Sequence, residues 1–272
     1  MKEPIAIFDS GYGGLTILDS IRKELPEYDY IYLGDNARTP YGSRSFDVVY
    51  QYTLEAVKKL FSLGVHLVIL ACNTASAKAL RSIQQKDLPV IDPNRRVLGV
   101  IRPSVEVVSE FTKSNHVGVV GTAGTVLSNS YPLEINKIAP EIIVEQEACP
   151  MWVSLVENSE FDGKGADYFV NKNLTTLFEK DSKIDTLILG CTHYPLLLPK
   201  IMKYAPSGVK IISQGDIVSK SLHDYLLRHP EMEEKCSKNG DVKFYTTEHP
   251  DKFHQTAGIF FKGDIRVEHL EL

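Results

Sequence analysis

Short apolar runs recur along the whole chain, and segments with helical periodicity separate them. Several runs are apolar at consecutive positions, which is typical of parallel strands covered on both faces. Between them, apolar residues recur every three or four positions from Leu15 to Leu25 and from Val49 to Leu63, as on one face of an amphipathic helix. This alternation predicts a doubly wound α/β fold. The predicted strands are Ile5–Phe8, Tyr30–Leu33, Leu67–Leu70, Val117–Val120, Ile142–Glu145, Thr186–Leu189, Lys210–Ile212 and Lys243–Tyr245.

Two of these strands end in the same kind of motif. Residues 67–76 read LVILACNTAS and residues 186–195 read TLILGCTHYP, so Cys72 and Cys191 each follow an apolar run and precede an expected helix. Open α/β sheets bind ligands at the carboxyl ends of their strands. A helix N-terminus also stabilises a thiolate, the reactive form of cysteine. Two cysteines in matching positions favour symmetric chemistry, with an acid or base on each side of a substrate.

The two cysteines have three alternative interpretations: a buried apolar role, a metal site and a disulfide. A lone cysteine at a strand end is more often a small buried apolar residue. Cys72, Cys191 and His193 could bind a metal, but no CxxC or His-x₃-His spacing is present, so we expect no metal site. A disulfide between the two thiols does not suit a reducing compartment.

Composition narrows the class of protein and its partners. The net charge is −5, from 30 basic and 35 acidic residues without a basic run, so no nucleic-acid partner is expected. No apolar segment approaches the roughly 20 residues that span a bilayer, so no membrane partner is expected. The N-terminal segment enters a strand almost at once, which leaves no room for a signal peptide. With four cysteines in 272 residues, a cytoplasmic location is expected.

The separation of the two cysteine motifs predicts two sheets that face each other across a cleft, related by pseudo-symmetry. Pro93 and the paired arginines beside it suggest one crossing between domains, and Pro206–Gly208 suggests the return. We therefore expect residues 1–97 and 208–272 to form a discontinuous first α/β domain and residues 98–207 a second one. The polar segment His229–Asp241 predicts a solvated loop.

A glycine-rich segment, IAIFDSGYGGLT, places Asp9 and Ser10 at the end of the first strand. It resembles a dinucleotide-binding turn, and Asp35 after the next strand would suit a ribose. However, Thr16 stands where the third glycine of GxGxxG is required, so a nicotinamide-dependent enzyme is disfavoured. What remains is a turn whose backbone amides can approach an anion. Asp9 could equally be a turn-forming residue.

Two further segments carry candidate binding groups. Pro40–Ser43 (PYGS) follows a strand and a turn, and alone it is an ordinary turn. In GTAGT, Thr122 and Thr125 follow another strand, where their hydroxyls could hold a carboxylate or could cap a helix.

Six segments together resemble the glutamate racemases, a family of the cofactor-independent aspartate/glutamate racemase superfamily. They occur in the family's order over nearly the whole chain. The resemblance implies two α/β domains around a cleft and interconversion of L- and D-glutamate without a cofactor. It also implies a supply of D-glutamate for peptidoglycan synthesis, and a homodimer. The segments are DSGYGGL (Asp9–Leu15), PYG (Pro40–Gly42), ACNTAS (Ala71–Ser76), GTAGT (Gly121–Thr125), ACPMWVSLVE (Ala148–Glu157) and GCTHYPLL (Gly190–Leu197).

The same resemblance implies roles for individual residues. Cys72 and Cys191 match the catalytic cysteines, with Cys72 acting on D-glutamate and Cys191 on L-glutamate. Asp9, Glu157 and His193 match the groups that assist the thiols. The substrate-binding positions are Asp9, Ser10, Tyr41, Gly42, Asn73, Thr74, Thr122, Thr125, Thr192 and His193. The chain departs from the family pattern at Trp152 and Ser154, where a smaller aromatic and a proline are more usual.

Racemisation gives these residues a physical rationale. A proton leaves Cα on one face and another returns on the opposite face, which requires an acid/base group on each face. Oriented donors must stabilise the negative charge that develops, and groups around Asn73, Thr74 and Thr192 are candidates. A racemase for aspartate or hydantoins would keep both cysteines and differ in its carboxylate pocket. A regulatory binding role as a second activity is a further alternative.

Overall fold

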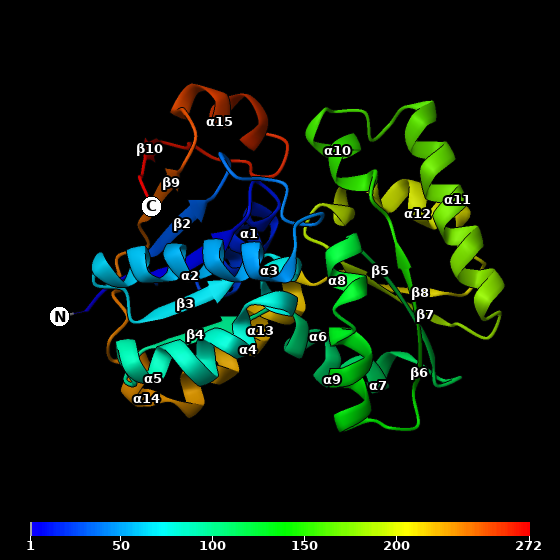
Figure 1. Cartoon of the computed structure of the whole chain (residues 1–272), viewed down its shortest axis with the longest axis horizontal. Coiled ribbons are helices and arrows are strands. Elements are labelled where there is room, and N and C mark those ends of the chain that lie inside the picture. The colour runs from blue at the N-terminus through cyan, green and yellow to red at the C-terminus, as the bar shows by residue number, and fades with distance from the viewer. Residues whose placement is uncertain (1) are drawn as a thin grey trace.

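The computed structural model describes residues 2–272, which form two parallel β-sheets flanked by helices (Figure 1). The first sheet has six strands in the order β10-β9-β2-β1-β3-β4, and every neighbouring pair is parallel. The strands β1, β2 and β3 are buried at every position, which accounts for their unbroken apolar sequences. The bounds are β1 Ile5–Asp9, β2 Tyr30–Gly34, β3 Leu67–Leu70, β4 Arg96–Gly99, β9 Val242–Thr246 and β10 Val267–His269.

The second sheet has four parallel strands in the order β6-β5-β7-β8. This order repeats the order β2-β1-β3-β4 of the first sheet, so the two sheets share one topology. In Figure 1 the sheets lie side by side, the first in the half that holds both termini and the second in the green and yellow half. The bounds are β5 His116–Gly121, β6 Ile143–Ala148, β7 Thr186–Gly190 and β8 Lys210–Ile212.

Helices connect the strands and cover both sheets. Their bounds in the first half are α1 Gly14–Glu24, α2 Phe46–Ser62, α3 Asn73–Lys78, α4 Leu80–Ser82, α5 Leu88–Ile91, α13 Gly215–Arg228, α14 Pro230–Glu233 and α15 Pro250–Ala257, with a π-helical turn at Ile83–Asp87. In the second half they are α6 Ile101–Glu106, α7 Val108–Phe111, α8 Ala123–Leu127, α9 Ser130–Ile138, α10 Trp152–Glu157, α11 Lys164–Lys180 and α12 Leu198–Tyr204, with a 3₁₀ turn at Tyr194–Leu197.

The hydrophobic core continues from one half into the other. One cluster of buried side chains extends from Leu15 and Ile21 on α1, through Cys191 and Tyr194, to Leu174 on α11. The two halves therefore pack on each other through apolar contacts, and burial of that surface stabilises their arrangement.

All eight predicted strands are present, and the predicted α/β fold with parallel sheets is confirmed. Two strands were not predicted. Both are short edge strands with polar ends, β4 beginning at Arg96 and β10 carrying Glu268 and His269. The prediction of a solvated loop at His229–Asp241 is wrong, because the segment contains α14 and buries Met232 and Cys236.

The division into residues 1–97 with 208–272 and residues 98–207 stays a prediction. Two strands bear on the predicted domain boundaries. β4 ends at Gly99 and pairs with β3, and β8, Lys210–Ile212, pairs with β7. Both crossings between the sheets therefore begin a few residues after the predicted positions.

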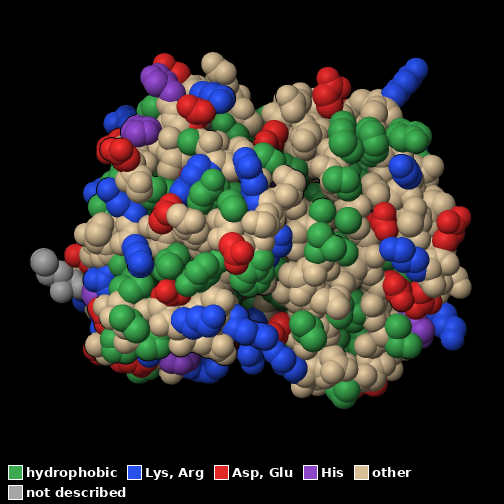
Figure 2. Space-filling view, in the orientation of Figure 1, with side chains coloured by type: hydrophobic (Ala, Val, Ile, Leu, Met, Phe, Trp, Pro, Cys, Tyr) green, Lys and Arg blue, Asp and Glu red, His purple; other side chains and the backbone are tan. Residues whose placement is uncertain are grey.

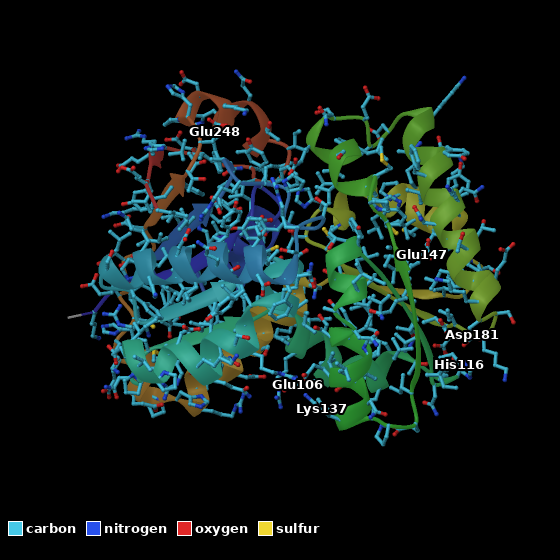
Figure 3. All side chains as sticks on the ribbon, in the orientation of Figure 1. Glu106, His116, Lys137, Glu147, Asp181 and Glu248 are labelled. Atoms are coloured by element: carbon cyan, nitrogen blue, oxygen red, sulfur yellow. The ribbon has the colours of Figure 1, made fainter. Side chains whose placement is uncertain are left out.

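Acidic and basic side chains mix over both halves of the visible surface, and a notch marks the upper outline where the halves meet (Figure 2). Ion pairs such as His116 with Asp181 lie on the outer edge of the second half, away from that junction (Figure 3). None of the helices within residues 2–272 is long and apolar enough to cross a membrane.

Candidate active site

The carboxyl ends of β1, β3, β5 and β7 meet at the junction between the two sheets. Each of these strands lies at or next to the centre of its sheet, and a polar or thiol side chain lies at or just after its carboxyl end. Asp9 and Cys72 come from the first sheet, and Thr122 and Cys191 come from the second. All four side chains are at least nine-tenths buried. The topology thus gathers most of the predicted site residues in one place.

Cys72 lies at the N-cap of α3. Its sulfur accepts a hydrogen bond from the amide of Ala75 at 3.5 Å, and the thiol donates to the hydroxyl of Ser10 at 3.4 Å. Burial raises the pKa of Cys72 to about 12, and the nearby carboxylate of Asp9 contributes to the rise. The negative charge of Cys191 has a smaller effect in the same direction, so the two sulfurs interact electrostatically. Cys72 therefore retains its proton at neutral pH.

Asp9 is buried beside that thiol. One carboxylate oxygen, Oδ2, accepts from the amide of Gly11 at 2.9 Å. The other, Oδ1, is buried and has no hydrogen-bond partner within residues 2–272. Burial raises the pKa of Asp9, although the charge of His193 opposes the rise. An unpaired buried carboxylate oxygen is costly for folding, so its presence here suggests a function.

Cys191 has a different neighbour. Nδ1 of His193 lies 3.8 Å from its sulfur, and Nε2 of the same ring lies 2.9 Å from Oε1 of Glu157, at the end of α10. Burial opposes protonation of His193, but contacts with Cys191 and Glu157 outweigh it and raise its pKa to about 10. The imidazole is therefore protonated at neutral pH. Trp152 and Ser154 leave the Glu157–His193 contact intact.

Gly13 allows the first sheet to approach this group closely. A Cβ atom at this position would lie 2.2 Å from Oγ1 of Thr192 and 2.5 Å from Nδ1 of His193. Any larger residue would displace both side chains. The hydroxyl of Thr16 also donates to the carbonyl oxygen of Thr192 at 3.2 Å, which holds the loop after β7 against α1.

Three hydroxyls join the halves on the other side of the site. Oγ1 of Thr74 lies 2.9 Å from that of Thr122 and 3.5 Å from that of Thr125, and the last two are 3.1 Å apart. Thr122 also caps α8 by accepting from the amide of Thr125. The amide of Gly124 donates to the carbonyl oxygen of Gly42 at 2.8 Å. These contacts close the PYG segment against the second sheet.

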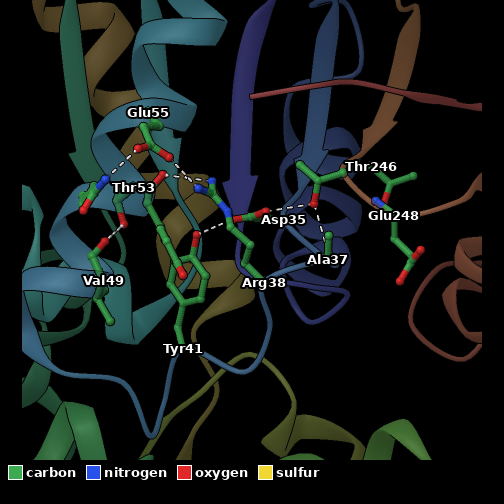
Figure 4. Close-up of polar contacts among 12 residues, drawn as sticks. Asp35, Ala37, Arg38, Tyr41, Val49, Thr53, Glu55, Thr246 and Glu248 are labelled. Carbon is green, nitrogen blue, oxygen red and sulfur yellow. Dashed lines mark hydrogen bonds and ion pairs between the residues drawn. The ribbon is translucent and has the colours of Figure 1, made fainter.

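Tyr41 uses its hydroxyl within the protein. It donates to Oδ2 of Asp35, which also accepts from Nε of Arg38 at 2.7 Å, while Thr247 donates to Oδ1 at 2.8 Å (Figure 4). Burial, followed by the charge of Asp35, raises the pKa of Tyr41. The structure therefore places Tyr41 in the wall of the site, and Gly42 beside it presents backbone atoms.

Asn73 lies in a hydrogen-bond network that sequence reasoning missed. Its amide contacts Gln214 and Tyr131, which come from the second crossing and from α9. The available signals were that Gln214 follows a strand end, as Cys72 and Cys191 do, and that Tyr131 closes the segment GTAGTVLSNSY. A small cavity of about 130 Å³ is lined by Cys191 together with Thr16, Ser20, Thr192 and Gln214, among others.

The four cysteines are free thiols, and no group of three or more His, Cys, Asp or Glu side chains within the described residues could hold a metal ion. Two thiols, one from each sheet and each with its own proton-holding neighbour, can remove a proton from a small molecule and return one. The hydroxyls, backbone amides and Asn73 can bind carboxylates.

Comparisons with known proteins show the family and the fold. Residues 15–221 match the family model described as Asp/Glu/Hydantoin racemase. A glutamate racemase of Listeria innocua is 38% identical over 274 residues, which cover 100% of this chain and 99% of that protein. The crystal structure of a Bacillus anthracis glutamate racemase has a TM-score of 0.89 at 34% identity, covering 99% of this chain and 98% of that one. A Francisella tularensis glutamate racemase, solved with D-glutamate, has a TM-score of 0.88 at 35% identity, with the same coverage.

Proposed function

The chain belongs to the Asp/Glu/hydantoin racemase family, and from that premise we propose that it interconverts L- and D-glutamate by a two-thiol acid/base mechanism. One observation carries the proposal. Cys72 and Cys191 follow topologically equivalent strands, β3 and β7, and lie close enough for the charge of one to affect the pKa of the other. Each thiol can therefore act on one face of a bound α-carbon.

The two thiols exchange roles with the direction of reaction. We propose that Cys191 removes the α-proton of L-glutamate while the thiol of Cys72 donates its proton. In the other direction Cys72 first passes its thiol proton to the carboxylate of Asp9 and then removes the α-proton of D-glutamate, while Cys191 receives a proton from His193. In each case the opposite thiol returns a proton to the other face. Asp9 serves as the proton-holding partner near Cys72, while His193, oriented by Glu157, serves Cys191. This proton transfer between two thiols uses no cofactor and forms no covalent intermediate.

The remaining side chains bind the substrate. We propose that Ser10, Asn73, Thr74 and Thr192 surround the α-amino acid group, beside the thiols. Thr122 and Thr125, with the backbone around Tyr41 and Gly42, hold a carboxylate at the junction of the halves. Support comes from the buried hydroxyl cluster of Thr74, Thr122 and Thr125, whose donors an anion could share. Donors fixed by folding also stabilise the developing negative charge without reorganisation.

Glutamate is proposed over aspartate because the named relatives of high identity are glutamate racemases. The test is to incubate the purified protein with each enantiomer of glutamate and of aspartate and to measure both enantiomers by chiral chromatography. We expect each glutamate enantiomer to reach an equimolar mixture. Faster conversion of aspartate than of glutamate would refute the substrate assignment. No conversion of either amino acid would refute the proposed racemase activity.

Four further proposals accompany this one. The product D-glutamate supplies peptidoglycan synthesis. The protein acts in the cytoplasm, which is supported by four free thiols, two of which the reaction needs reduced. It forms a homodimer, which sedimentation at several concentrations would test, since a single species of 30.5 kDa at all concentrations would refute it. We also propose that residues 1–97 with 208–272 and residues 98–207 form the two domains on either side of the substrate.

A further inference from the structure

Gln214 lies where the two crossings between the sheets meet. Its side chain is 3% exposed, and it lies directly before α13, as Val100 lies directly before α6. The Nε2 atom of Gln214 lies 2.9 Å from the carbonyl oxygen of Val100 and 3.0 Å from Oγ of Ser104. One carboxamide thus links both crossings.

The same carboxamide takes part in a closed cycle with two other side chains. Nδ2 of Asn73 donates to Oε1 of Gln214 at 2.6 Å. Nε2 of Gln214 donates to the hydroxyl oxygen of Tyr131 at 2.9 Å, and that hydroxyl donates to Oδ1 of Asn73 at 2.8 Å. Within the cycle each group donates once and accepts once, and the other N–H of Gln214 is directed to Val100 rather than to Ser104, so the cycle has a single direction.

The carbonyl oxygen of Val100 determines which groups of the cycle donate and which accept. A backbone carbonyl can only accept, so the group of Gln214 that faces it must be the amide nitrogen. Oε1 of Gln214 then faces Asn73, and only the nitrogen of Asn73 can donate to it. If the Asn73 amide turned over, two oxygens would face each other in a buried site, at the cost of an unsatisfied polar group.

We propose that Gln214 is a positioning residue that fixes the orientation of the Asn73 amide. The cycle uses one N–H of Asn73. In the proposed function the second N–H binds the substrate. Without Gln214, Asn73 can present its oxygen to the substrate carboxylate, which it would repel. This inference rests on the proposed function, in which Asn73 binds the substrate.

The test is a set of kinetic measurements on Gln214→Ala, Asn73→Ala and the double variant. Gln214→Ala should raise KM for glutamate about tenfold, as for loss of an oriented hydrogen bond to a charged group, with a smaller change in kcat. Since Gln214 acts through Asn73, the double variant should resemble Asn73→Ala alone. An unchanged KM, or effects that add in full, would overturn the proposal.

Two other variants separate this role from a loss of folding. Ser104→Ala removes a contact of Gln214 on the side away from Asn73, so KM should stay within about twofold of the wild-type value. Tyr131→Phe removes the donor to Oδ1 of Asn73 but leaves Gln214 in place, so KM should rise by less than in Gln214→Ala, and this variant gives a readout even if Gln214→Ala is unstable. Equal effects of Ser104→Ala and Tyr131→Phe would refute a specific role.

A readout independent of catalysis distinguishes failure of this inference from failure of the proposed function. The side-chain amide resonance of Asn73 can be assigned by its loss in Asn73→Asp. Its hydrogen exchange should become at least about tenfold faster in Gln214→Ala, because the acceptor that protects it is gone. Unchanged exchange would refute the proposed role of Gln214 in fixing the Asn73 amide, whether or not the wild-type protein racemises glutamate.

Discussion

The two thiols occupy equivalent positions in two sheets of one topology, yet their surroundings differ. Cys72 follows β3, caps a helix and contacts the hydroxyl of Ser10, with the carboxylate of Asp9 nearby. Cys191 follows β7 and contacts the imidazole of His193, which Glu157 holds from its other side. One thiol therefore has a negatively charged neighbour, and the other has a positively charged one.

This difference shows how a repeated fold can serve a reaction whose two directions are not identical. At rest the Cys72 side retains its proton on sulfur, because burial and Asp9 raise the pKa of that thiol to about 12. The Cys191 side retains a proton on His193, whose pKa is about 10. Different groups therefore hold a proton on the two sides of the substrate: the sulfur of Cys72 on one side and the imidazole of His193 on the other.

The largest effects are expected from the thiols themselves. Cys72→Ala and Cys191→Ala should each reduce racemisation about 10³-fold in both directions, because each turnover needs both an acid and a base. Chiral chromatography measures the loss, and Cys236→Ala, at a buried thiol outside the site, is the matched control. Either variant racemising at the wild-type rate would end the two-thiol model.

The same variants sharpen the contrast through exchange of the α-proton with deuterated water. Cys191→Ala retains Cys72, so it should still exchange the α-proton of D-glutamate faster than that of L-glutamate. Cys72→Ala should show the opposite preference. Mass spectrometry of recovered glutamate gives both rates. Identical preferences in the two variants would contradict the assignment of one enantiomer to each thiol.

A smaller loss is expected when the positive neighbour of Cys191 is removed. His193→Asn should lower kcat/KM about 100-fold, within the range of one general acid or base. Glu157→Gln keeps the ring but weakens the contact that helps hold its proton, so about a tenfold loss is expected. Kinetics with both enantiomers measure these losses, and a larger effect of Glu157→Gln than of His193→Asn would contradict the order of contacts.

His193 also predicts a dependence of stability on pH. Its pKa is raised from an unfolded value near 6.5 to about 10 in the folded protein. The stability that protonation contributes is therefore fully present below about pH 6.5 and is lost as pH rises through 10. Thermal unfolding should show a larger destabilisation by His193→Asn at pH 6 than at pH 10. A constant difference would contradict the raised pKa.

Replacing the negative neighbour of Cys72 should separate activity from stability. Asp9→Asn removes a buried charge with one unpaired oxygen, so we expect higher thermal stability at pH 7 and about a tenfold loss of activity. Because burial raises the pKa of Asp9 above its unfolded value near 3.8, the penalty applies above the folded pKa and fades as pH falls toward 3.8. A gain in stability that persists at pH 3.5 would contradict a charge effect.

The sequence predicts one part of this comparison much better than the other. Unbroken apolar strands, and the residues that follow them, locate Cys72, Cys191, Asp9 and Thr122, because strand ends in parallel sheets gather at one edge. The contacts that make the thiols differ depend on packing between distant segments. Gln214 reaches Asn73 only after both crossings meet, and no local pattern in the sequence encodes that contact.

The smallest predicted effect concerns the wall of the site on the Cys72 side. Asp35→Asn weakens the acceptor shared by Tyr41 and Arg38, so the segment carrying Gly42 should be held less firmly and KM should rise about threefold, with kcat nearly unchanged. Glu55→Gln is the matched control, because Glu55 contacts Arg38 but not Tyr41. Saturation curves for both enantiomers measure the change. If Glu55→Gln raised KM as much as Asp35→Asn, the effect would come from Arg38 rather than from the contact that fixes Tyr41.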